Sequence, residues 1–511
     1  MFILAVASDP ARALTILSLL AIVWYATSAV YSWCRLRHIP GPFLASFSYL
    51  WLGRLAFGGR QREGYTLATS KYGSLVRVGP NELLTNDPEV VKRMSSTKSQ
   101  YWKSKWYTGF QFNPYHPVMF TMTDPAAHDK MKAQLMPGYS GRDISSVEPD
   151  VDTQVNSLIT LIRKKYITSP GIGGFRPLDL ARVIPLFTLD IISKLALGQE
   201  LGCLETDSDR YQFYKTTEEG LPWLSLITEV SWMREIVYSR LGVKLFGPKE
   251  TDLKGFGKSI KLANDEVRRR FVPGADKEEK SILGSFIRHG LTQTECEVET
   301  QFMFVAGSDT TAASIKITML YILAAPRVYQ RLKDEIAAAV REGKASKLIT
   351  NAEAKELPYL QAVVYEGLRI RPVVTNMLSK EVPQGGDTIN GRFIPAGTSI
   401  GVNHSSLLRS KTVFGEDADM FRPERFLEVD TTTLTELQRH VELGFGYGRW
   451  MCAGKSIAMM ELNKIFFQLL RHFDFQLVDP QTPMISHSHG LFVDTGLWVT
   501  ITESSEPTVL A

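Results

Sequence analysis

One cysteine of this chain, Cys452, lies in a glycine-rich segment whose residue types could hold a metal-containing cofactor. The segment reads Phe445-Gly446-Tyr447-Gly448-Arg449-Trp450-Met451-Cys452-Ala453-Gly454. Glycines let the backbone turn tightly and approach a flat cofactor at positions where a side chain would collide. A thiolate presented by such a turn can be the axial ligand of a haem iron. The segment therefore raises the hypothesis of a haem-thiolate site at Cys452.

The residues after Cys452 predict a helix that begins next to the sulfur. Between residues 453 and 470, apolar residues recur at helical spacing, namely Ile457, Met460, Ile465, Phe466 and Leu469. Free N–H groups and the macrodipole at a helix N-terminus favour an anionic sulfur. Cys452 would therefore be held where a thiolate is stabilised.

Two other interpretations apply to this segment taken alone. A lone cysteine is most often a small buried hydrophobic residue. Gly454-Lys455-Ser456 also ends like a phosphate-binding loop, a motif that has four residues between its glycines. Gly448 and Gly454 are separated by five residues, and no buried strand precedes them, which argues against a phosphate loop.

A long helix predicted from about Glu295 to Ala325 could position a second set of reactive side chains. It has no interior proline, ends before Pro326, and would extend about 45 Å at about 1.5 Å per residue. Its middle reads Ala306-Gly307-Ser308-Asp309-Thr310-Thr311. A helix of this length must cross the whole body of the protein.

The middle of this helix is locally unfavourable, which calls for a reason. Gly307 costs about 1 kcal/mol against alanine, and a mid-helix hydroxyl can bond back to the carbonyl four residues earlier and open the ladder. Two interpretations stay open. The segment is a helix-packing notch, or it is a groove where a small ligand meets an acid and an alcohol, Asp309 and Thr310, for proton delivery.

Glu366 and Arg369 form a third set, because residues three apart share one helix face and can pair. An exposed pair of this kind is common and contributes only a few tenths of a kcal/mol. Farther on, Phe421-Arg422-Pro423-Glu424-Arg425-Phe426 places a second arginine, Arg425, in a turn fixed by proline.

The composition of the 511-residue chain, 44% hydrophobic and 22% charged, is that of an ordinary globular protein. Its length allows two or three ordinary domains or one large one. The net charge of +4 comes without a dense run of lysine or arginine, which argues against nucleic-acid binding. The chain has four cysteines, Cys34, Cys203, Cys296 and Cys452, and they show no CxxC spacing. This argues against a disulfide framework or a zinc site and fits a reducing cytosol.

The first forty residues predict a membrane anchor. From Ala13 to Cys34 there are 22 consecutive uncharged residues, and about 20 apolar residues span the hydrocarbon core. Arg35, Arg37 and His38 follow, so the positive-inside rule places the rest of the chain in the cytoplasm. The alternative is a cleaved signal peptide, but the run is long and lacks a basic leader.

The remaining patterns predict a mainly α protein with a smaller β part. Residues 35–45 contain Pro40-Gly41-Pro42, which breaks a helix and forms a basic, proline-rich hinge. Helical spacing dominates from about residue 150 to 340. Strands are expected at residues 75–84, in an Asn-Gly hairpin at residues 388–394, and at residues 491–501.

Taken together, these motifs resemble the cytochrome P450 family of haem-thiolate monooxygenases. The resemblance rests on four motifs in order: AGSDTT at residues 306–311, ExxR at 366–369, FxPERF at 421–426 and the cysteine loop at 445–454. It covers essentially the whole chain after Pro40, and the anchor resembles that of microsomal members. It implies the cytochrome P450 fold with a long central helix over the haem, an anchor (1–34), the hinge (35–45) and a catalytic domain (46–511).

The resemblance implies a role for each motif residue. Cys452 would bind the iron of haem b, with Phe445 beside the sulfur and with Gly446 and Gly454 in the loop. Asp309 and Thr310 would deliver protons during oxygen activation, while Ala306 and Gly307 leave room for O2. Glu366, Arg369 and Arg425 would form a buried structural triad, which we assign to folding and haem retention because buried ion pairs are costly to break.

Two positions depart from the family pattern. The usual arginine two residues before the cysteine is replaced by Trp450, and Arg449 comes one residue earlier, so a contact from Arg449 to a haem propionate is expected but not its geometry. The usual Trp-x-x-x-Arg becomes His128 and Lys132, which could face the propionates although lysine lacks the arginine fork. The Gly-Arg-Trp variant resembles filamentous-fungal members, including the pisatin-demethylase-like group, and implies secondary metabolism.

The resemblance also implies partners. Electrons would come from NADPH through a separate cytochrome P450 reductase, with cytochrome b5 as an optional donor, at the endoplasmic reticulum membrane. The substrate would be a lipophilic small molecule that is hydroxylated, epoxidised or oxidised in several steps. The pocket expected for it comprises residues 110–120, Phe302, Val305, residues 373–376, Leu491 and Phe492. The alternatives are a haem-thiolate isomerase or dehydratase that inserts no oxygen, and a non-catalytic haem-binding membrane protein.

Overall fold

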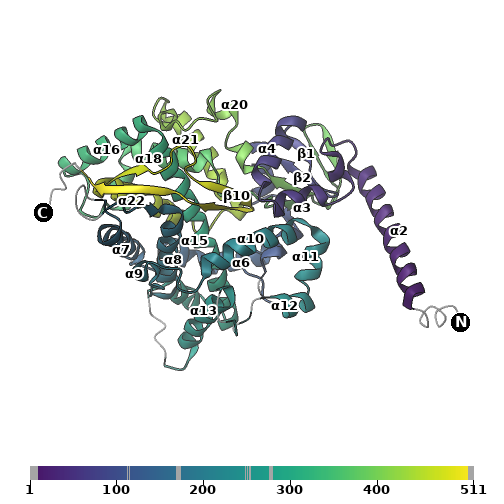
Figure 1. The fold of residues 1–511 in the computed structure, drawn as a ribbon. Helices are drawn as coiled ribbons and strands as arrows, with labels where there is room; N and C mark the ends of the chain where they lie inside the picture. Colours follow the sequence, from purple (N-terminus) through teal and green to yellow (C-terminus); the bar gives the residue numbers. More distant parts are fainter. Residues whose placement is uncertain are drawn as a thin grey trace.

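A large helical body that contains several small sheets and one projecting helix make up the fold (Figure 1). The computed structural model describes residues 10–504 apart from 112, 114, 169–173, 248, 250, 253–254 and 275–279. The predicted anchor and catalytic domain therefore extend, at residues 1–9 and 505–511, beyond the described residues. Phe112 and Pro114 of the expected pocket also lie outside them.

The described helices come in two groups along the chain. The first group comprises α2 (Pro10–Leu36), α3 (Leu50–Phe57), α4 (Gln61–Tyr72), α5 (Pro88–Ser95), α6 (Pro125–Tyr139), α7 (Val147–Lys165), α8 (Leu180–Leu197), α9 (Cys203–Thr206), α10 (Phe213–Glu229), α11 (Ser231–Val237), α12 (Arg240–Phe246), α13 (Gly255–Phe271) and α14 (Ile282–Arg288). The second comprises α15 (Gln293–Ala324), α16 (Pro326–Arg341), α17 (Asn351–Lys355), α18 (Pro358–Ile370), α19 (His404–Leu407), α20 (Lys411–Phe414), α21 (Thr431–Val441) and α22 (Lys455–His472). Short 3-10 turns include η2 (Lys105–Phe110), η3 (Pro423–Phe426), η4 (Glu442–Phe445) and η5 (Gly448–Trp450).

The strands form small sheets rather than one central sheet. One sheet has the order β1-β2-β8-β5-β3, from β1 (Leu75–Arg77), β2 (Glu82–Thr85), β3 (Trp102–Lys103), β5 (Lys380–Glu381) and β8 (Ser399–Val402). Another has the order β4-β12-β9, from β4 (Leu178–Asp179), β9 (Phe473–Leu477) and β12 (Trp498–Glu503). Two hairpins pair β6 (Asp387–Ile389) with β7 (Arg392–Ile394), and β10 (Ile485–His489) with β11 (Leu491–Thr495).

The predicted fold class, mainly α with a smaller β part, is confirmed. The Asn390-Gly391 turn lies between β6 and β7, where the sequence placed it. The predicted strand at residues 491–501 is instead two strands, β11 and β12, because the chain turns at Gly496 with a φ of 78°. Only glycine adopts that conformation without strain.

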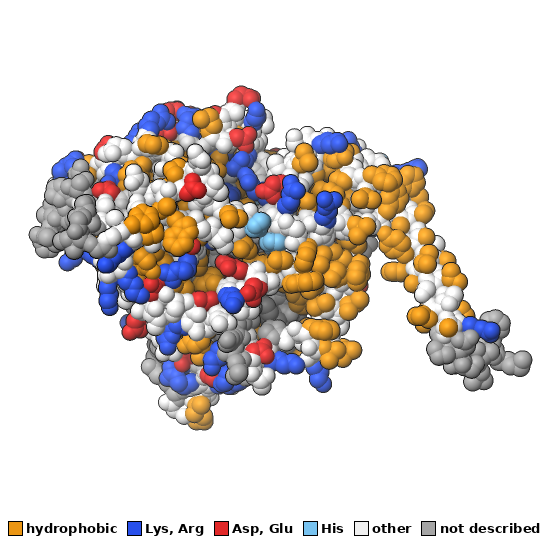
Figure 2. Space-filling model, in the orientation of Figure 1, with side chains coloured by type: hydrophobic (Ala, Val, Ile, Leu, Met, Phe, Trp, Pro, Cys, Tyr) orange, Lys and Arg blue, Asp and Glu red, His pale blue; other side chains and the backbone are white. Residues whose placement is uncertain are grey.

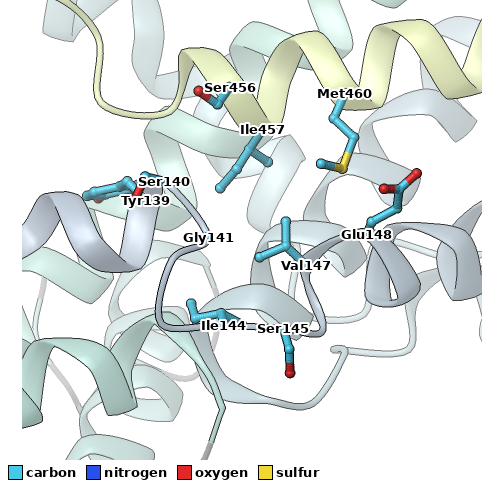
Figure 3. Close-up of a pocket in the computed structure, with 10 residues that line it drawn as sticks. All are labelled: Tyr139, Ser140, Gly141, Ile144, Ser145, Val147, Glu148, Ser456, Ile457 and Met460. Carbon is cyan, nitrogen blue, oxygen red and sulfur yellow. The ribbon is translucent and has the colours of Figure 1, made fainter. Parts of the chain in front are cut away.

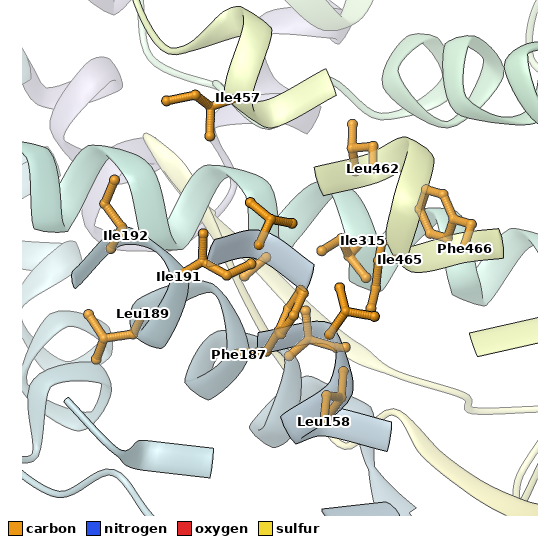
Figure 4. Close-up of a cluster of buried hydrophobic side chains, with 14 of the residues drawn as sticks. Leu158, Phe187, Leu189, Ile191, Ile192, Ile315, Ile457, Leu462, Ile465 and Phe466 are labelled. Atoms are coloured by element: carbon orange, nitrogen blue, oxygen red, sulfur yellow. The ribbon is translucent and has the colours of Figure 1, made fainter. Parts of the chain in front are cut away.

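Helix α15 crosses the body and packs most closely on α8. Thr292 and Glu295 cap its start reciprocally, a capping box that fixes the first turn. Pro326 ends it, because proline cannot continue the hydrogen-bond ladder. Apolar side chains of α7, α8, α15 and α22 meet in the main core (Figure 4), so the central helix is held between elements that come before and after it in the chain.

Helix α2 is joined to the body by its last turn. It extends to Leu36, two residues beyond the predicted end of the anchor at residue 34. The Arg77 guanidinium donates to the carbonyl of Ser32 over 3.0 Å, and Arg35 donates to Asn81 over 2.6 Å. Leu36 is fully buried. The start of the expected hinge therefore packs against the sheet formed by β1 and β2.

Candidate functional site

The cysteine loop is closed by backbone contacts between η4 and α22. The Cys452 N–H donates to the Phe445 carbonyl over 2.7 Å. Gly446 has a φ of 81°, and a Cβ there would lie 2.9 Å from the Trp450 carbonyl oxygen. Gly448 has a φ of 57°, and its Cβ would lie 2.5 Å from the Ser95 carbonyl oxygen. Both glycines are therefore required by the turn that presents Cys452.

The Cys452 thiol is exposed although protein surrounds it. Burial raises its pKa, while the backbone N–H groups of Gly454 and Lys455 and the positive charge of Lys132 oppose that rise. Cys452 forms no disulfide. The side chain is therefore accessible, yet enough protein surrounds it to disfavour the charged form of the thiol. The N–H groups near the start of α22 are available to the sulfur, as the predicted helix N-terminus requires.

Asp309 and Thr310 lie in the middle of α15 and keep partial exposure. Thr310 Oγ1 donates to the Ala306 carbonyl over 2.9 Å, the back-bond expected for a mid-helix hydroxyl. Asp309 Oδ2 is buried without a hydrogen-bond partner among the described residues. Burial raises the pKa of Asp309 to about 7, although the charge of Lys316 lowers it. This carboxyl can therefore hold or release a proton near neutral pH.

Gly307 packs against a neighbouring helix. A Cβ at Gly307 would lie 2.7 Å from Ile192 Cδ1 of α8, closer than side chains approach in proteins. Gly307 is therefore a contact between two packed helices, the interpretation that stayed open in the sequence. The expectation that Gly307 and Ala306 leave room for O2 stays a prediction.

Replacing Asp309 by asparagine is expected to stabilise the protein at pH 8 by about 2 kcal/mol and to have little effect near pH 4. The raised pKa, about 7, means that the native carboxyl keeps a proton that the unfolded chain releases. The contribution of Asp309 to the free energy of unfolding must then fall as the pH rises from about 4 to about 7. Thermal unfolding across this range measures the difference, with the exposed Asp334→Asn as control; the same difference at every pH would contradict it.

Glu366, Arg369 and Arg425 form a buried cluster between α18 and η3. Arg369 donates to both Glu366 oxygens over 2.7 and 2.8 Å, and Arg425 Nε contacts them over 3.1 and 3.2 Å. The remaining guanidinium N–H groups reach carbonyls of Leu408, Phe414, Asp417, Ala418 and Met420. Glu366 and Arg369 are fully buried, so the exposed-pair alternative is wrong.

Arg449 and Lys132 connect the cysteine loop to α6 and its surroundings. Lys132 Nζ donates to the carbonyls of Arg449 over 2.7 Å and of Met451 over 3.2 Å. Arg449 Nε pairs with Asp129 over 3.1 Å, and its Nη2 donates to the Thr97 carbonyl over 2.8 Å. Two of the three expected propionate ligands, Arg449 and Lys132, thus already bond to protein groups that fix the loop.

His128 lies next to the residue that replaces the usual arginine. Its ring centroid is 4.4 Å from that of Trp450, and its Nδ1 is 3.1 Å from Asp129. Burial lowers the pKa of His128 to about 4. The ring is therefore neutral at physiological pH.

Two buried lysines near Trp450 were not recognised in the sequence. Lys103 on β3 and Lys380 on β5 lie with Nζ 4.8 and 4.9 Å from the Trp450 ring. The indole Nε1 of Trp450 is buried without a partner among the described residues. No local motif marks these lysines, because only the pairing of β3 with β5 brings them together. Unpaired donors and cations beside Cys452 fit haem, a flat cofactor that carries two carboxylates.

Part of the expected substrate pocket is brought together. Phe120 lies 5.6 Å from Phe110 and 4.9 Å from Phe302, ring centre to ring centre. The Thr375 N–H donates to the Gly490 carbonyl over 2.8 Å, which joins residues 373–376 to the β10–β11 hairpin. Phe492 is instead engaged by Arg371, whose guanidinium carbon lies 4.0 Å from its ring centre.

A cavity of about 280 Å³ lies next to the start of α22 (Figure 3). It opens between the end of α6, the segment that leads into α7, and the first turns of α22. Its lining residues are Tyr139, Ser140, Gly141, Ile144, Ser145, Val147, Glu148, Ser456, Ile457 and Met460. Neither Cys452 nor Asp309 lines it, so this cavity is separate from the candidate site.

Comparisons with known proteins agree with this geometry. The family model described as Cytochrome P450 matches residues 39–497. The chain is 47% identical over 471 residues to the cytochrome P450 monooxygenase aba1 of Botryotinia fuckeliana, covering 92% of each chain. It is 43% identical over 490 residues to ABA1 of Pyricularia oryzae, covering 95% of this chain and 96% of that protein. Pisatin demethylase of Fusarium vanettenii is 30% identical over 464 residues, covering 89% and 88%.

Proposed function

The chain belongs to the cytochrome P450 family of haem-thiolate monooxygenases, and from this premise we propose the roles of its residues, its partners and its location. The reaction is insertion of one oxygen atom from O2 into a lipophilic substrate of fungal secondary metabolism. The observation that carries the residue assignments is the closed loop that presents Cys452 beside the start of α22. The relatives give no support to an isomerase, a dehydratase or a non-catalytic haem protein.

Cys452 is the proposed ligand of the haem iron. Phe445 shields the sulfur, and Gly446 and Gly454 keep the loop close to the porphyrin. Ala306 would leave space for O2 beside Thr310. Bound haem supplies the redox centre at which O2 is activated and oxygen is transferred to the substrate. The protein holds this centre, excludes bulk water and positions the proton donors.

Asp309 and Thr310 are the proposed proton donors. The Asp309 carboxyl has an Oδ2 without a hydrogen-bond partner among the described residues and a pKa of about 7, so it can take a proton from solvent and pass it on. The Thr310 hydroxyl is held by the Ala306 carbonyl, which fixes the direction of its oxygen. Asp309 therefore sets the proton supply, and Thr310 sets where the proton is delivered.

Replacing Thr310 by alanine is expected to keep the haem but divert electrons to hydrogen peroxide. Loss of a positioned proton donor commonly lowers a rate by about 100-fold or more, so product formed per NADPH should fall at least about tenfold. Peroxide, NADPH and product are measured in one assay. Ser314→Ala is the matched control, because Ser314 makes the same type of back-bond one turn later; unchanged coupling in Thr310→Ala would remove Thr310 from the proton route.

Electrons are proposed to come from NADPH through cytochrome P450 reductase, with cytochrome b5 as an optional second donor, at the endoplasmic reticulum membrane. Among the described residues, α2 is long and apolar enough to span a bilayer. We propose residues 1–34 as the anchor, 35–45 as the joining segment and 46–511 as the catalytic domain. Arg35 and Arg37 at the end of the span support a cytoplasmic position for that domain.

A second apolar surface supports membrane contact by the body itself. Figure 2 shows hydrophobic side chains gathered on the side of the body that faces α2, over α3 and α10 to α12. Exposed large residues there are Leu50, Phe57, Trp223, Trp232, Ile236, Leu241, Leu245 and Phe246. Apolar patches of this extent mark interaction surfaces. This surface would rest on the bilayer and receive a lipophilic substrate from it.

Deletion of residues 2–31 is expected to leave the protein bound to phospholipid vesicles, because the apolar surface remains. The contacts by which Ser32 and Arg35 join the body are kept in the shortened protein. Adding Trp232→Glu and Phe246→Glu to the deletion should release at least about tenfold more protein, since burying a charge in lipid is costly. Vesicle sedimentation measures the bound fraction. The control is Met420→Glu, which charges an exposed residue away from this surface; release by the deletion alone would contradict the prediction.

A further inference from the structure

Lys103 and Lys380 are a like-charge pair inside the protein. They lie directly opposite each other in the antiparallel pairing of β3 with β5. Only 6% of Lys103 and 5% of Lys380 is exposed. Like charges directly opposite in a sheet destabilise it, and buried lysines are normally paired with an acid. Two such lysines at one position require an explanation.

The protein itself supplies neutral partners only. Lys103 Nζ donates to the carbonyls of Phe120 over 2.7 Å and of Met119 over 3.2 Å. Lys380 Nζ donates to the Tyr107 hydroxyl over 3.1 Å. Within the described part of the chain, neither lysine forms an ion pair with a carboxylate. The buried Glu299 acts on Lys103 electrostatically but is not within ion-pair distance of it, so neither ammonium group has a directly contacting counter-ion among the described residues.

Trp450 lies against both lysines and is itself incompletely bonded. Its ring centre is 4.8 Å from Lys103 Nζ and 4.9 Å from Lys380 Nζ. Its Nε1 is buried and has no acceptor among the described residues. An indole N–H can only donate, and buried tryptophans usually find an acceptor. One anionic group could therefore accept from both ammonium groups and from the indole N–H. Trp450 is two residues before Cys452 in the chain.

We propose that Trp450, Lys103 and Lys380 form the cradle for the two carboxylates of the haem, with the indole N–H and both ammonium groups donating to carboxylate oxygens. The inference rests on the proposed function, because it requires haem at Cys452. In this arrangement the neutral indole of Trp450 takes the place of the usual arginine, and the positive charge comes from Lys103 on β3 and Lys380 on β5. Arg449 is then free to pair with Asp129 and fix the loop.

The same chemistry could serve a carboxylate on the substrate instead of those on the haem. The two sources differ in what the lysines control. If they bind haem, their removal loosens the cofactor with or without substrate. If they bind substrate, haem retention is unchanged and only binding of a carboxylate-bearing ligand weakens.

The test measures transfer of haem from the purified protein to excess apomyoglobin. Lys103→Met, Lys380→Met and Trp450→Phe should each lose haem about tenfold faster than wild type, the loss expected for one charge-assisted hydrogen bond. Lys380→Arg should retain haem nearly as well as wild type. The matched controls, Lys105→Met and Trp102→Phe, change exposed residues of the same segment and should have no effect.

Two further measurements separate haem binding from a structural role. Haem dimethyl ester, which lacks free carboxylates, should leave wild type as fast as haem leaves the lysine variants, and the variants should no longer differ. The haem-free lysine variants should unfold at higher temperature than haem-free wild type, because an uncompensated buried charge is removed. A purely structural lysine would change haem loss and apoprotein stability in the same direction.

The outcomes distinguish failure of this inference from failure of the proposed function on which it rests. Unchanged haem loss in all three variants, together with a thiolate-type spectrum in wild type, would overturn the cradle and leave the proposed function standing. Weaker binding of a carboxylate-bearing ligand alone would assign the lysines to the substrate and also overturn it. Absence of a thiolate-type spectrum in wild type would overturn the proposed function itself.

Discussion

Replacement of Cys452 by alanine is expected to abolish the strongly red-shifted Soret band of the reduced carbon monoxide complex, and all turnover with it. The band reports a thiolate opposite carbon monoxide, and no other described cysteine lies in a comparable loop. The loop should survive the change, because its closing bond joins the Cys452 N–H to the Phe445 carbonyl and does not use the side chain. Absorption spectra of the dithionite-reduced protein measure the effect.

The matched control is Cys34→Ala, which removes an exposed cysteine at the end of α2. It should leave the spectrum and turnover unchanged. Circular dichroism of Cys452→Ala should show wild-type helix content, which separates loss of the ligand from loss of the fold. A red-shifted band that persists in Cys452→Ala would remove this cysteine from the iron.

Replacement of Glu366 by glutamine is expected to destabilise the body by about 3–5 kcal/mol, enough to prevent recovery of folded haem protein. The amide keeps the shape but loses the charge that two buried arginines face, Arg369 over 2.7 Å and Arg425 over 3.1 Å. Arg369 would remain buried without a counter-ion among the described residues, and Arg425 would keep only its pairing with Asp417 over 3.0 Å. Yield of haem protein and thermal unfolding measure the loss.

Glu356→Gln is the control for this change, because Glu356 is exposed just before α18. Its effect should be within about 0.5 kcal/mol, as for most surface substitutions. Arg369→Lys should also fail, since lysine cannot make the paired contact to both oxygens of Glu366. Normal recovery of Glu366→Gln would show that the cluster does not hold the body together.

Elements with strong local signals could be predicted from the sequence. The long helix α15 was expected from the absence of interior proline and the stop at Pro326, and its start is fixed by the Thr292 capping box. The pairing of Glu366 with Arg369 follows from helical spacing, because residues three apart share a face. The cysteine loop was recognised because its glycines meet steric needs that are local to the turn.

Contacts between distant segments could not be predicted in this way. Lys103 and Lys380 are 277 positions apart in the chain and meet only through the pairing of β3 with β5. The partner of Arg449, Asp129, comes from α6, and one sequence does not show that this acid is near the loop. Gly307 fitted both a packing contact and a ligand groove, since either use needs a missing side chain, and one sequence does not show that Ile192 of α8 lies against it.

The most direct test of the central claim is the isotope content of the product made under labelled dioxygen. Comparison of metabolites with and without the gene identifies the substrate, which is then incubated with the purified protein, reductase and NADPH. A monooxygenase places one labelled oxygen atom in the product for each oxygen inserted, and forms no product without NADPH. Unlabelled product that forms equally well without oxygen or NADPH would contradict the account and point to an isomerase or dehydratase.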